Sequence, residues 1–216
     1  MIGIVDCGIG NIASVENALI RLGCDAERLT EPGKMHTYDR LVLPGVGSFQ
    51  YAMGSMQDAG WVDAIHVYAA SGRPVLGICL GMQLLFSRGL EHGDTAGLGL
   101  IPGEVRVLEP EPPCKLPHVG WNTVSLVREH PLFRRVRSHV DFYFVHSYQC
   151  VPRDEADIIA RCDYGGSFVA SVVRGNIAGM QFHPEKSQPA GLKILENFAD
   201  WTENWGFPQV QVFKDL

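Results

Sequence analysis

Residues 74–86, PVLGICLGMQLLF, constrain the fold most, because they run from a buried strand directly into a helix. Cys79 stands at the junction, with Gly77 and Gly81 two residues away on either side. A residue on so sharp a bend has a strained backbone, and neighbouring elements pass too close for side chains at the flanking positions. The segment therefore predicts a strand–bend–helix unit at the carboxyl edge of a parallel sheet, with the helix running through about Phe86.

Strands and helices alternate through the first half of the chain. Residues 2–7 and 40–43 read as buried strands, like residues 74–79. Apolar spacing predicts helices over residues 12–22, 49–58 and 61–71, and Gly23 and Gly72 end two of them. This alternation is typical of a parallel sheet with helices on its faces.

The second half is rich in short β-type segments separated by glycine, proline and aspartate. Gly175-Asn176 lies between two of these segments and predicts a hairpin turn. We expect a largely antiparallel addition that returns to the main sheet, then a final helix with one apolar stripe: Leu192, Leu195, Ala199 and Thr202. The predicted class is α/β and flavodoxin-like, with a single domain over residues 1–204 and a tail over residues 205–216 without an assigned role.

Composition narrows the function. The chain has 18 Lys and Arg against 24 Asp and Glu, a formal net charge of −6, so nucleic acid is not an expected partner. No apolar run approaches the ~18 residues of a membrane-spanning helix. Six scattered cysteines and the absence of a signal peptide predict a cytoplasmic protein with reduced thiols. The eight histidines lack metal-ligand spacing, so we expect neither a metal site nor a cofactor.

A glycine-rich loop follows the first strand. Residues 8–13, GIGNIA, fit the G-x-G-x-x-A turn that seats a dinucleotide pyrophosphate, with Glu31 placed for a ribose contact. The motif is short in a chain with 24 glycines, and a tight strand-to-helix turn explains it without a ligand. The structural interpretation is therefore favoured over nucleotide binding.

Cys79 carries the strongest chemical signal. Gly-x-Cys-x-Gly is the nucleophile elbow with cysteine in place of serine, and it lifts the sulfur out of the sheet. The following helix favours an anionic sulfur, and the Leu80 N–H is free to donate to an oxyanion. A buried cysteine between packing glycines would give the same pattern, so a second element has to decide.

That second element is the segment GMQFHPE at residues 179–185. We expect it to be extended, so that His183 and Glu185, two residues apart, face the same side. Glu185 can then orient the His183 ring, and His183 can take the Cys79 proton and return it to a leaving amine. The three residues together predict acyl-transfer chemistry.

A third loop, LPGVGSF at residues 43–49, also follows a strand. Gly45 and Gly47 allow backbone N–H groups to turn toward a ligand. In an open α/β sheet the ligand crevice lies beyond the carboxyl ends of the strands. We therefore expect the loops at Gly8, Gly45 and Cys79 to meet, with a second oxyanion donor between Gly45 and Gly47.

These motifs resemble the class I (triad) glutamine amidotransferases, which share the elbow, Gln83 and the sequence His183-Pro184-Glu185. The segments PGVGSF, GICLGMQLLF, PHVGWN, FYFVHSY and GMQFHPEKS are similar, more narrowly, to the glutaminase subunits of imidazole glycerol phosphate synthase. The resemblance covers nearly the whole chain. It implies a heterodimer in which ammonia from glutamine passes to a separate (β/α)8-barrel cyclase subunit in histidine biosynthesis.

The resemblance also implies roles for individual residues. Cys79 forms a glutamyl thioester, His183 protonates the departing ammonia, and Glu185 orients His183. The oxyanion is held by the N–H of Leu80 and, after a peptide reorients, by that of Val46. The implied glutamine contacts are Gln83, Glu91, Ser147 and Tyr148, and the implied partner contacts are Asn11, Trp121, Asn122 and Lys186. The loop at Gly8 then faces the partner and the ammonia exit rather than a nucleotide.

Two other classes stay open on the sequence. One is another triad hydrolase, either an amidotransferase serving a different acceptor or a stand-alone γ-glutamyl or peptide hydrolase. The other is a non-catalytic protein that keeps the fold. The intact Cys79, His183 and Glu185 argue against the second class, and PHVGWN and PEKS favour the synthase over the first.

Overall fold

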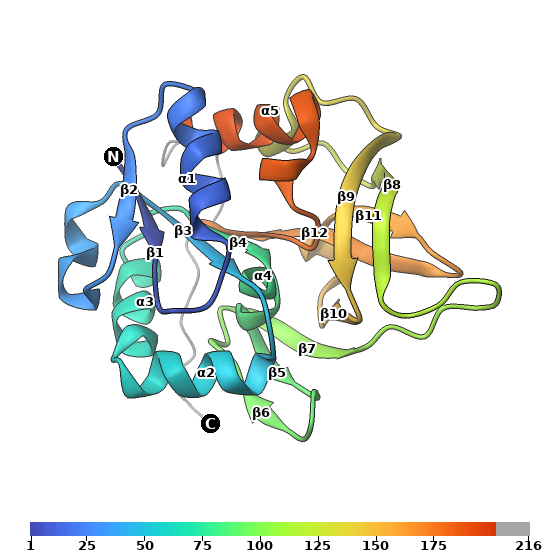
Figure 1. Ribbon diagram of the computed structural model, residues 1–216, viewed down its shortest axis with the longest axis horizontal. Coiled ribbons are helices and arrows are strands. Elements are labelled where there is room, and N and C mark those ends of the chain that lie inside the picture. The colour runs from blue at the N-terminus through green and yellow to red at the C-terminus, as the bar shows by residue number, and fades with distance from the viewer. Residues whose placement is uncertain (202–216) are drawn as a thin grey trace.

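A computed structural model describes residues 1–201 (Figure 1). Its strands are β1 (Ile2–Val5), β2 (Ala26–Leu29), β3 (Arg40–Gly45), β4 (Val75–Cys79), β5 (Phe86–Gly89), β6 (Thr95–Ala96), β7 (Ile101–Val107), β8 (His118–Leu126), β9 (Val140–His146), β10 (Tyr148–Pro152), β11 (Ile158–Asp163), β12 (Ser167–Arg174) and β13 (Ile177–Met180). Its α-helices are α1 (Ile12–Arg21), α2 (Phe49–Asp58), α3 (Trp61–Ala70), α4 (Leu80–Leu84) and α5 (Gln188–Ala199).

One large sheet organises the molecule, in the order β2-β1-β3-β4-β13-β12-β11-β8-β9. Its first five strands are parallel, in the flavodoxin-like order, and the remaining pairings are antiparallel. A smaller sheet, β10-β7-β5-β6, lies beside it. The predicted α/β class, with a parallel half and an antiparallel second half, is confirmed.

Helices cover both faces of the parallel half. Alternate residues of β3 show why: Leu41 and Leu43 pack into the core with α2 and α3, whereas Val42 packs into the core with α1 and α5. Figure 1 shows these two helix pairs on opposite sides of the sheet. A strand buried on both faces has to be apolar throughout, which is why RLVL reads as a continuous apolar run.

The antiparallel half joins the parallel half through β13. This strand pairs in parallel with β4 and forms a hairpin with β12 across Gly175-Asn176, as predicted. The joint brings the chain that follows β13 to the carboxyl end of β4, where the bend at Cys79 lies.

Three details differ from the sequence predictions. The helix after Cys79 ends at Leu84 rather than near Phe86, because Phe86 already pairs in β5. Strand β2 was not predicted, since its sequence AERL is polar and it forms the sheet edge. The most buried stripe of α5 is Gly191, Ile194, Leu195 and Phe198, with Leu192 and Ala199 at its border.

Some predictions fall outside the described residues. Thr202, the predicted domain end at residue 204 and the tail over residues 205–216 all lie there. Within residues 1–201, no helix combines the length and apolar character needed to cross a membrane.

Candidate active site

The bend between β4 and α4 holds Cys79 in a backbone conformation that L-residues rarely adopt, with φ 56° and ψ −112°. The flanking glycines make this conformation fit. A Cβ atom on Gly77 would lie 2.5 Å from the Gly81 carbonyl oxygen, and one on Gly81 would collide with the carbonyl oxygen of Leu43. The structure thus gives the physical reason for both glycines of the elbow.

The loop after β13 brings His183 and Glu185 together. His183 Nδ1 lies 2.8 Å from Glu185 Oε1, and both side chains are buried. The expected extended strand is wrong here, because β13 ends at Met180 and residues 184–186 form a 3₁₀ turn. The Lys186 N–H and the Ser187 hydroxyl both donate to the His183 carbonyl and close this turn.

The surroundings of His183 favour its charged form. Burial opposes the charge, but interactions with Cys79 and Glu185 outweigh burial and raise the pKa of His183 to about 9. Glu185 occupies Nδ1, whereas Nε2 is buried without a hydrogen bond within the described residues. Nε2 is therefore the ring atom available for exchanging a proton with Cys79.

Strand β9 contacts both the Cys79 thiol and the backbone of His183. On its free edge, the Tyr143 carbonyl accepts from the His183 N–H at 2.9 Å, and the Tyr143 N–H donates to the Ser187 hydroxyl at 3.0 Å. Two residues on, the Val145 carbonyl accepts a longer contact of 3.8 Å from the Cys79 thiol. One edge of one strand thus positions both groups.

This arrangement requires a strongly curled sheet. β9 is five places from β4 in the strand order, which would be roughly 24 Å in a flat sheet. The 3.8 Å contact between Cys79 and Val145 shows that the antiparallel half folds back over the end of β4. Figure 1 shows β8 and β9 turned out of the plane of β1, β3 and β4.

The three glycine loops meet at this edge. Gly45 is the register partner of Cys79, and a Cβ on Gly45 would lie 3.0 Å from the Gly81 amide nitrogen. A Cβ on Gly10 would lie 3.5 Å from Gly45. Beyond Gly45 the loop opens: Val46 is 46% exposed, and Gly47 has a φ of +109° with open space around it.

Two of the predicted glutamine contacts, Gln83 and Tyr148, connect to Cys79 through hydrogen bonds. The buried Gln83 amide donates to Gln181 at 3.0 Å and to the Tyr148 carbonyl at 3.4 Å, and Gln181 donates to the Cys79 sulfur at 3.8 Å. Burial and the nearby Glu91 raise the pKa of Tyr148. Glu91 has a second role, because its carboxylate accepts from the Phe49 N–H at 2.7 Å and caps α2.

Comparison with known proteins identifies the family and the fold. The family model described as "Glutamine amidotransferase class-I" matches residues 3–201. The protein named "Imidazole glycerol phosphate synthase subunit HisH" from Moorella thermoacetica is 48% identical over 205 residues, covering 95% of this chain and 97% of the relative. The chain belongs to the class I glutamine amidotransferases, in the HisH family. A HisH subunit from Sulfurimonas denitrificans is also 48% identical, over 93% of this chain and 98% of the relative.

Solved class I structures have the same fold. The structure of PurLQS from Thermotoga maritima has a TM-score of 0.73 at 19% identity, covering 92% of this chain and 97% of that one. A structure described as a glutamine amidotransferase has a TM-score of 0.71 at 18% identity, covering 91% and 98%. At these identities the likeness shows the shared architecture.

The predicted partner contacts of this amidotransferase divide into two groups. Trp121 is 47% exposed and packs edge-on against Tyr143, and the Lys186 ammonium lies 5.6 Å from the same ring. Asn11 is exposed just before α1, a helix that contacts the 3₁₀ turn of Lys186. Asn122 differs, because it follows Trp121 on β8, points to the opposite face and donates to the Asp163 carbonyl at 2.9 Å.

Sequence reasoning missed three residues of this site. Tyr143 lies between Trp121, Lys186 and His183, Gln181 contacts Cys79, and Ser187 closes the His183 loop. Gln181 and Ser187 flank the motif FHPEK, and Tyr143 belongs to FYFVHSY. The pattern of a strand shows which of its residues face each side of the sheet. It does not show that the sheet curls until its edge strand β9 meets the bend at Cys79.

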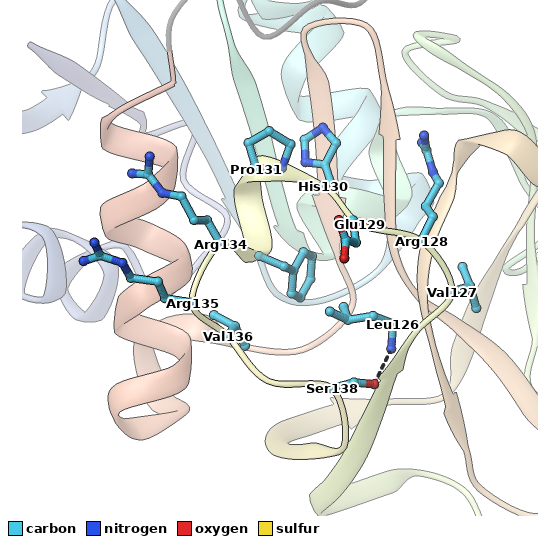
Figure 2. Close-up of a pocket in the computed structure, with 11 residues that line it drawn as sticks. Leu126, Val127, Arg128, Glu129, His130, Pro131, Arg134, Arg135, Val136 and Ser138 are labelled. Carbon is cyan, nitrogen blue, oxygen red and sulfur yellow. Dashed lines mark hydrogen bonds between the residues drawn. The ribbon is translucent and has the colours of Figure 1, made fainter.

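A cavity of about 1090 Å³ lies away from these residues, within the connection between β8 and β9 (Figure 2). It contains none of the predicted site residues, and its lining includes Leu126, Phe133 and Val136. Arg134, on its rim, pairs instead with Asp200 at 3.5 Å. The candidate site is therefore the cluster around Cys79 and not this cavity.

Proposed function

We propose that this HisH-family chain is the glutaminase subunit of imidazole glycerol phosphate synthase. It hydrolyses glutamine to glutamate and ammonia and supplies the ammonia to a cyclase subunit in histidine biosynthesis, in the cytoplasm. One observation carries the proposal: a strained, glycine-flanked Cys79 and a carboxylate-paired His183 are held by the same edge of β9. Identities of 48% to HisH subunits along nearly the whole chain support the same assignment.

The first half of the reaction forms a thioester. The thiol proton is held on Nε2 of His183, as the raised pKa of this histidine favours, and the Cys79 sulfur attacks the side-chain amide carbon of glutamine. The negative oxygen of the tetrahedral intermediate is held by the N–H of Leu80 and, once its peptide has turned, by that of Val46. The C–N bond then breaks, and His183 returns the proton to the departing nitrogen, which leaves as ammonia.

The second half releases glutamate. Water attacks the thioester carbon while His183 takes one of its protons, and collapse of the intermediate breaks the C–S bond. His183 then gives the proton back to the Cys79 sulfur. Glu185 stabilises the imidazolium in both halves, and its 2.8 Å contact with Nδ1 leaves Nε2 for the proton exchange with the sulfur.

The glutamine side of the site is assigned to Gln83, Glu91, Ser147 and Tyr148. Gln83 is only 6% exposed and donates to Gln181, and Gln181 in turn donates to the Cys79 sulfur. Burial, and after it the charge of Glu91, raises the pKa of Tyr148. These groups can receive the amino-acid end of glutamine while its amide reaches Cys79.

The partner is a (β/α)8-barrel cyclase subunit that docks beside the site. Val119, Trp121 and Val145 form exposed apolar surface on β8 and β9, and Lys186 adds a positive charge next to it. Exposed apolar surface of this kind marks protein–protein contact. Coupling also has a chemical reason, because ammonia released into bulk water is diluted and protonated before a distant consumer can use it.

The proposal is tested by purifying the chain with and without the cyclase subunit and measuring ammonia release from glutamine. We expect a stable complex and a faster glutaminase in the presence of the partner and its nucleotide ligand. A solitary, fully active hydrolase would instead favour a γ-glutamyl hydrolase. Equal rates with and without the partner would count against coupling through the Val46 loop.

A further inference from the structure

Two buried histidines take no part in the mechanism above. His118 on β8 and His146 on β9 are register partners, 2% and 7% exposed, on the adjacent strands seen in Figure 1. Nδ1 of His118 lies 3.0 Å from Nε2 of His146. The His118 ring is stacked between Tyr164 and Phe144, with ring centroids 3.9 and 4.9 Å away, so it has little freedom to rotate.

The hydrogen bonds of the pair fix both tautomers. His146 Nδ1 lies 2.8 Å from the Tyr148 carbonyl, which can only accept, so His146 carries its proton on Nδ1. In a neutral ring, Nε2 of His146 is then an acceptor, and His118 has to donate from its own Nδ1. Burial lowers the pKa of each histidine to about 4, so both rings are neutral at pH 7.

The inner end of this chain reaches the nucleophile. The Tyr148 carbonyl that accepts from His146 also accepts from the Gln83 amide at 3.4 Å. Gln83 donates its other amide hydrogen to Gln181 at 3.0 Å, and Gln181 donates to the Cys79 sulfur at 3.8 Å. His146 and Gln83 therefore donate to the same carbonyl, which joins the histidine pair to the contacts of Cys79.

The outer end reaches a predicted partner contact. With its proton on Nδ1, His118 presents Nε2 as an acceptor, and the Asn122 amide lies 3.5 Å from it. The same amide donates to the Asp163 carbonyl at 2.9 Å, so both of its hydrogens are engaged. Asn122 immediately follows Trp121, which belongs to the exposed apolar surface of β8.

We propose that His118 and His146 are positioning residues for glutamine: as a hydrogen-bonded pair they fix the Tyr148 carbonyl and, through it, Gln83 beside Cys79, and they connect this arrangement to Asn122. The inference rests on the proposed glutaminase function. Breaking the pair leaves Nε2 of His146 without its donor, so the ring that donates to the Tyr148 carbonyl is no longer held in place, although Cys79, His183 and Glu185 keep their own contacts. Glutamine binding should then suffer more than the chemical steps.

Two substitutions at His118 separate positioning from packing. His118→Phe keeps a flat ring between Tyr164 and Phe144 but removes the donor to His146. His118→Asn places an amide donor near the lost Nδ1 but gives up the ring stacking. His130→Phe is the matched control, because His130 is a buried histidine, 5% exposed, that lines the separate cavity between β8 and β9.

The experiment measures glutaminase kcat and KM in the complex with the cyclase subunit, together with the midpoint of urea unfolding. For His118→Phe we expect KM for glutamine to rise about 10-fold, the loss of one well-placed hydrogen bond, with kcat within about 3-fold of wild type. For His118→Asn we expect KM to return to within about 3-fold of wild type, although its unfolding midpoint falls below that of His118→Phe. His130→Phe should leave KM unchanged.

Three results would overturn the proposal. They are an unchanged KM in His118→Phe, a KM that follows the unfolding midpoint across the two variants, or an equal KM change in His130→Phe. Failure of the proposed function has a different signature, because the wild-type complex would then release no ammonia from glutamine.

Discussion

Two glycine turns at the same sheet edge have opposite surroundings. At the turn between β4 and α4, Gly77 and Gly81 are enclosed by backbone, and a Cβ on Gly81 would collide with the Leu43 carbonyl. At the loop after β3, Gly47 has nothing within 4 Å of its Cβ position, and Val46 is 46% exposed. Each turn contains a residue with a positive φ, which is Cys79 in the first turn and Gly47 in the second. Only the first turn is enclosed by packed backbone.

The difference teaches how the work of the site is divided. The locked turn presents the Cys79 sulfur and the Leu80 N–H in one fixed geometry before substrate arrives. The open loop, which carries the second proposed oxyanion donor at Val46, has room for its peptide to rotate. In the proposed mechanism, this chain therefore keeps its nucleophile ready, and its partner completes transition-state stabilisation by turning the Val46 peptide.

The largest expected effect comes from removing the sulfur of the locked turn. Cys79→Ala should lower glutaminase turnover at least ~10³-fold, because thioester formation has no other nucleophile. Binding of the cyclase and its synthesis from free ammonia should both persist. The measurement is ammonia release from glutamine in the complex, with Cys114→Ala as the cysteine control that keeps its activity; a loss below 10-fold in Cys79→Ala would contradict the assignment.

The second effect concerns folding. Gly81→Ala should lower the free energy of unfolding by about 3 kcal/mol or more, since the new methyl group meets rigid backbone. Gly47→Ala should cost only about 1–2 kcal/mol, the strain of a positive φ without a clash. Urea unfolding of both variants tests the contrast, and equal costs would show that the two turns are alike.

A third effect is pH-dependent. The raised pKa of His183 stabilises the folded state fully below pH 6.5, its ordinary value, and this contribution is lost as the pH rises toward about 9. Glu185→Gln removes one source of the raised pKa, so stability should decline less steeply across that range, and turnover should fall about 10–100-fold. Urea unfolding at several pH values provides the measurement, with the exposed Glu109→Gln as control; parallel declines in all three proteins would refute the role of the pair.

The smallest effect is expected at the open loop. Gly47→Ala restricts the rotation of the Val46–Gly47 peptide without touching Cys79 or His183. Glutaminase activity without the partner should change less than about 3-fold. The stimulation of this activity by the cyclase subunit with its nucleotide ligand bound should fall about 10-fold. The ratio of rates with and without the partner checks this, and a normal ratio would mean that Val46 does not need to turn.

The sequence predicted the parts of the molecule whose physics is local. The elbow around Cys79, the alternation of strands and helices, and the hairpin at Gly175-Asn176 each follow from short-range rules and are present in the structure. The pairing of His183 with Glu185 was also expected, although the reason given was wrong. A 3₁₀ turn starting at Pro184, not a strand, brings the two side chains together.

What the sequence did not predict depends on long-range geometry. The role of Tyr143 and Val145 follows from the curl that returns β9 to the end of β4. Gln181 reads as one more residue of a buried strand end until its contact with the Cys79 sulfur is seen. Asn122 lies on the opposite face of β8 from Trp121, since strand residues alternate, and its predicted partner contact stays a prediction.

The return of β9 to the bend at Cys79 also orders events during synthesis of the chain. The ribosome makes the sulfur-bearing turn roughly a hundred residues before the imidazole that activates it. Under the proposed mechanism, a nascent polypeptide that has built only β1 to β4 therefore carries an inert thiol, and competence arrives only when the hairpin of β12 and β13 closes. Unfinished chains cannot consume glutamine before there is a complete subunit to dock.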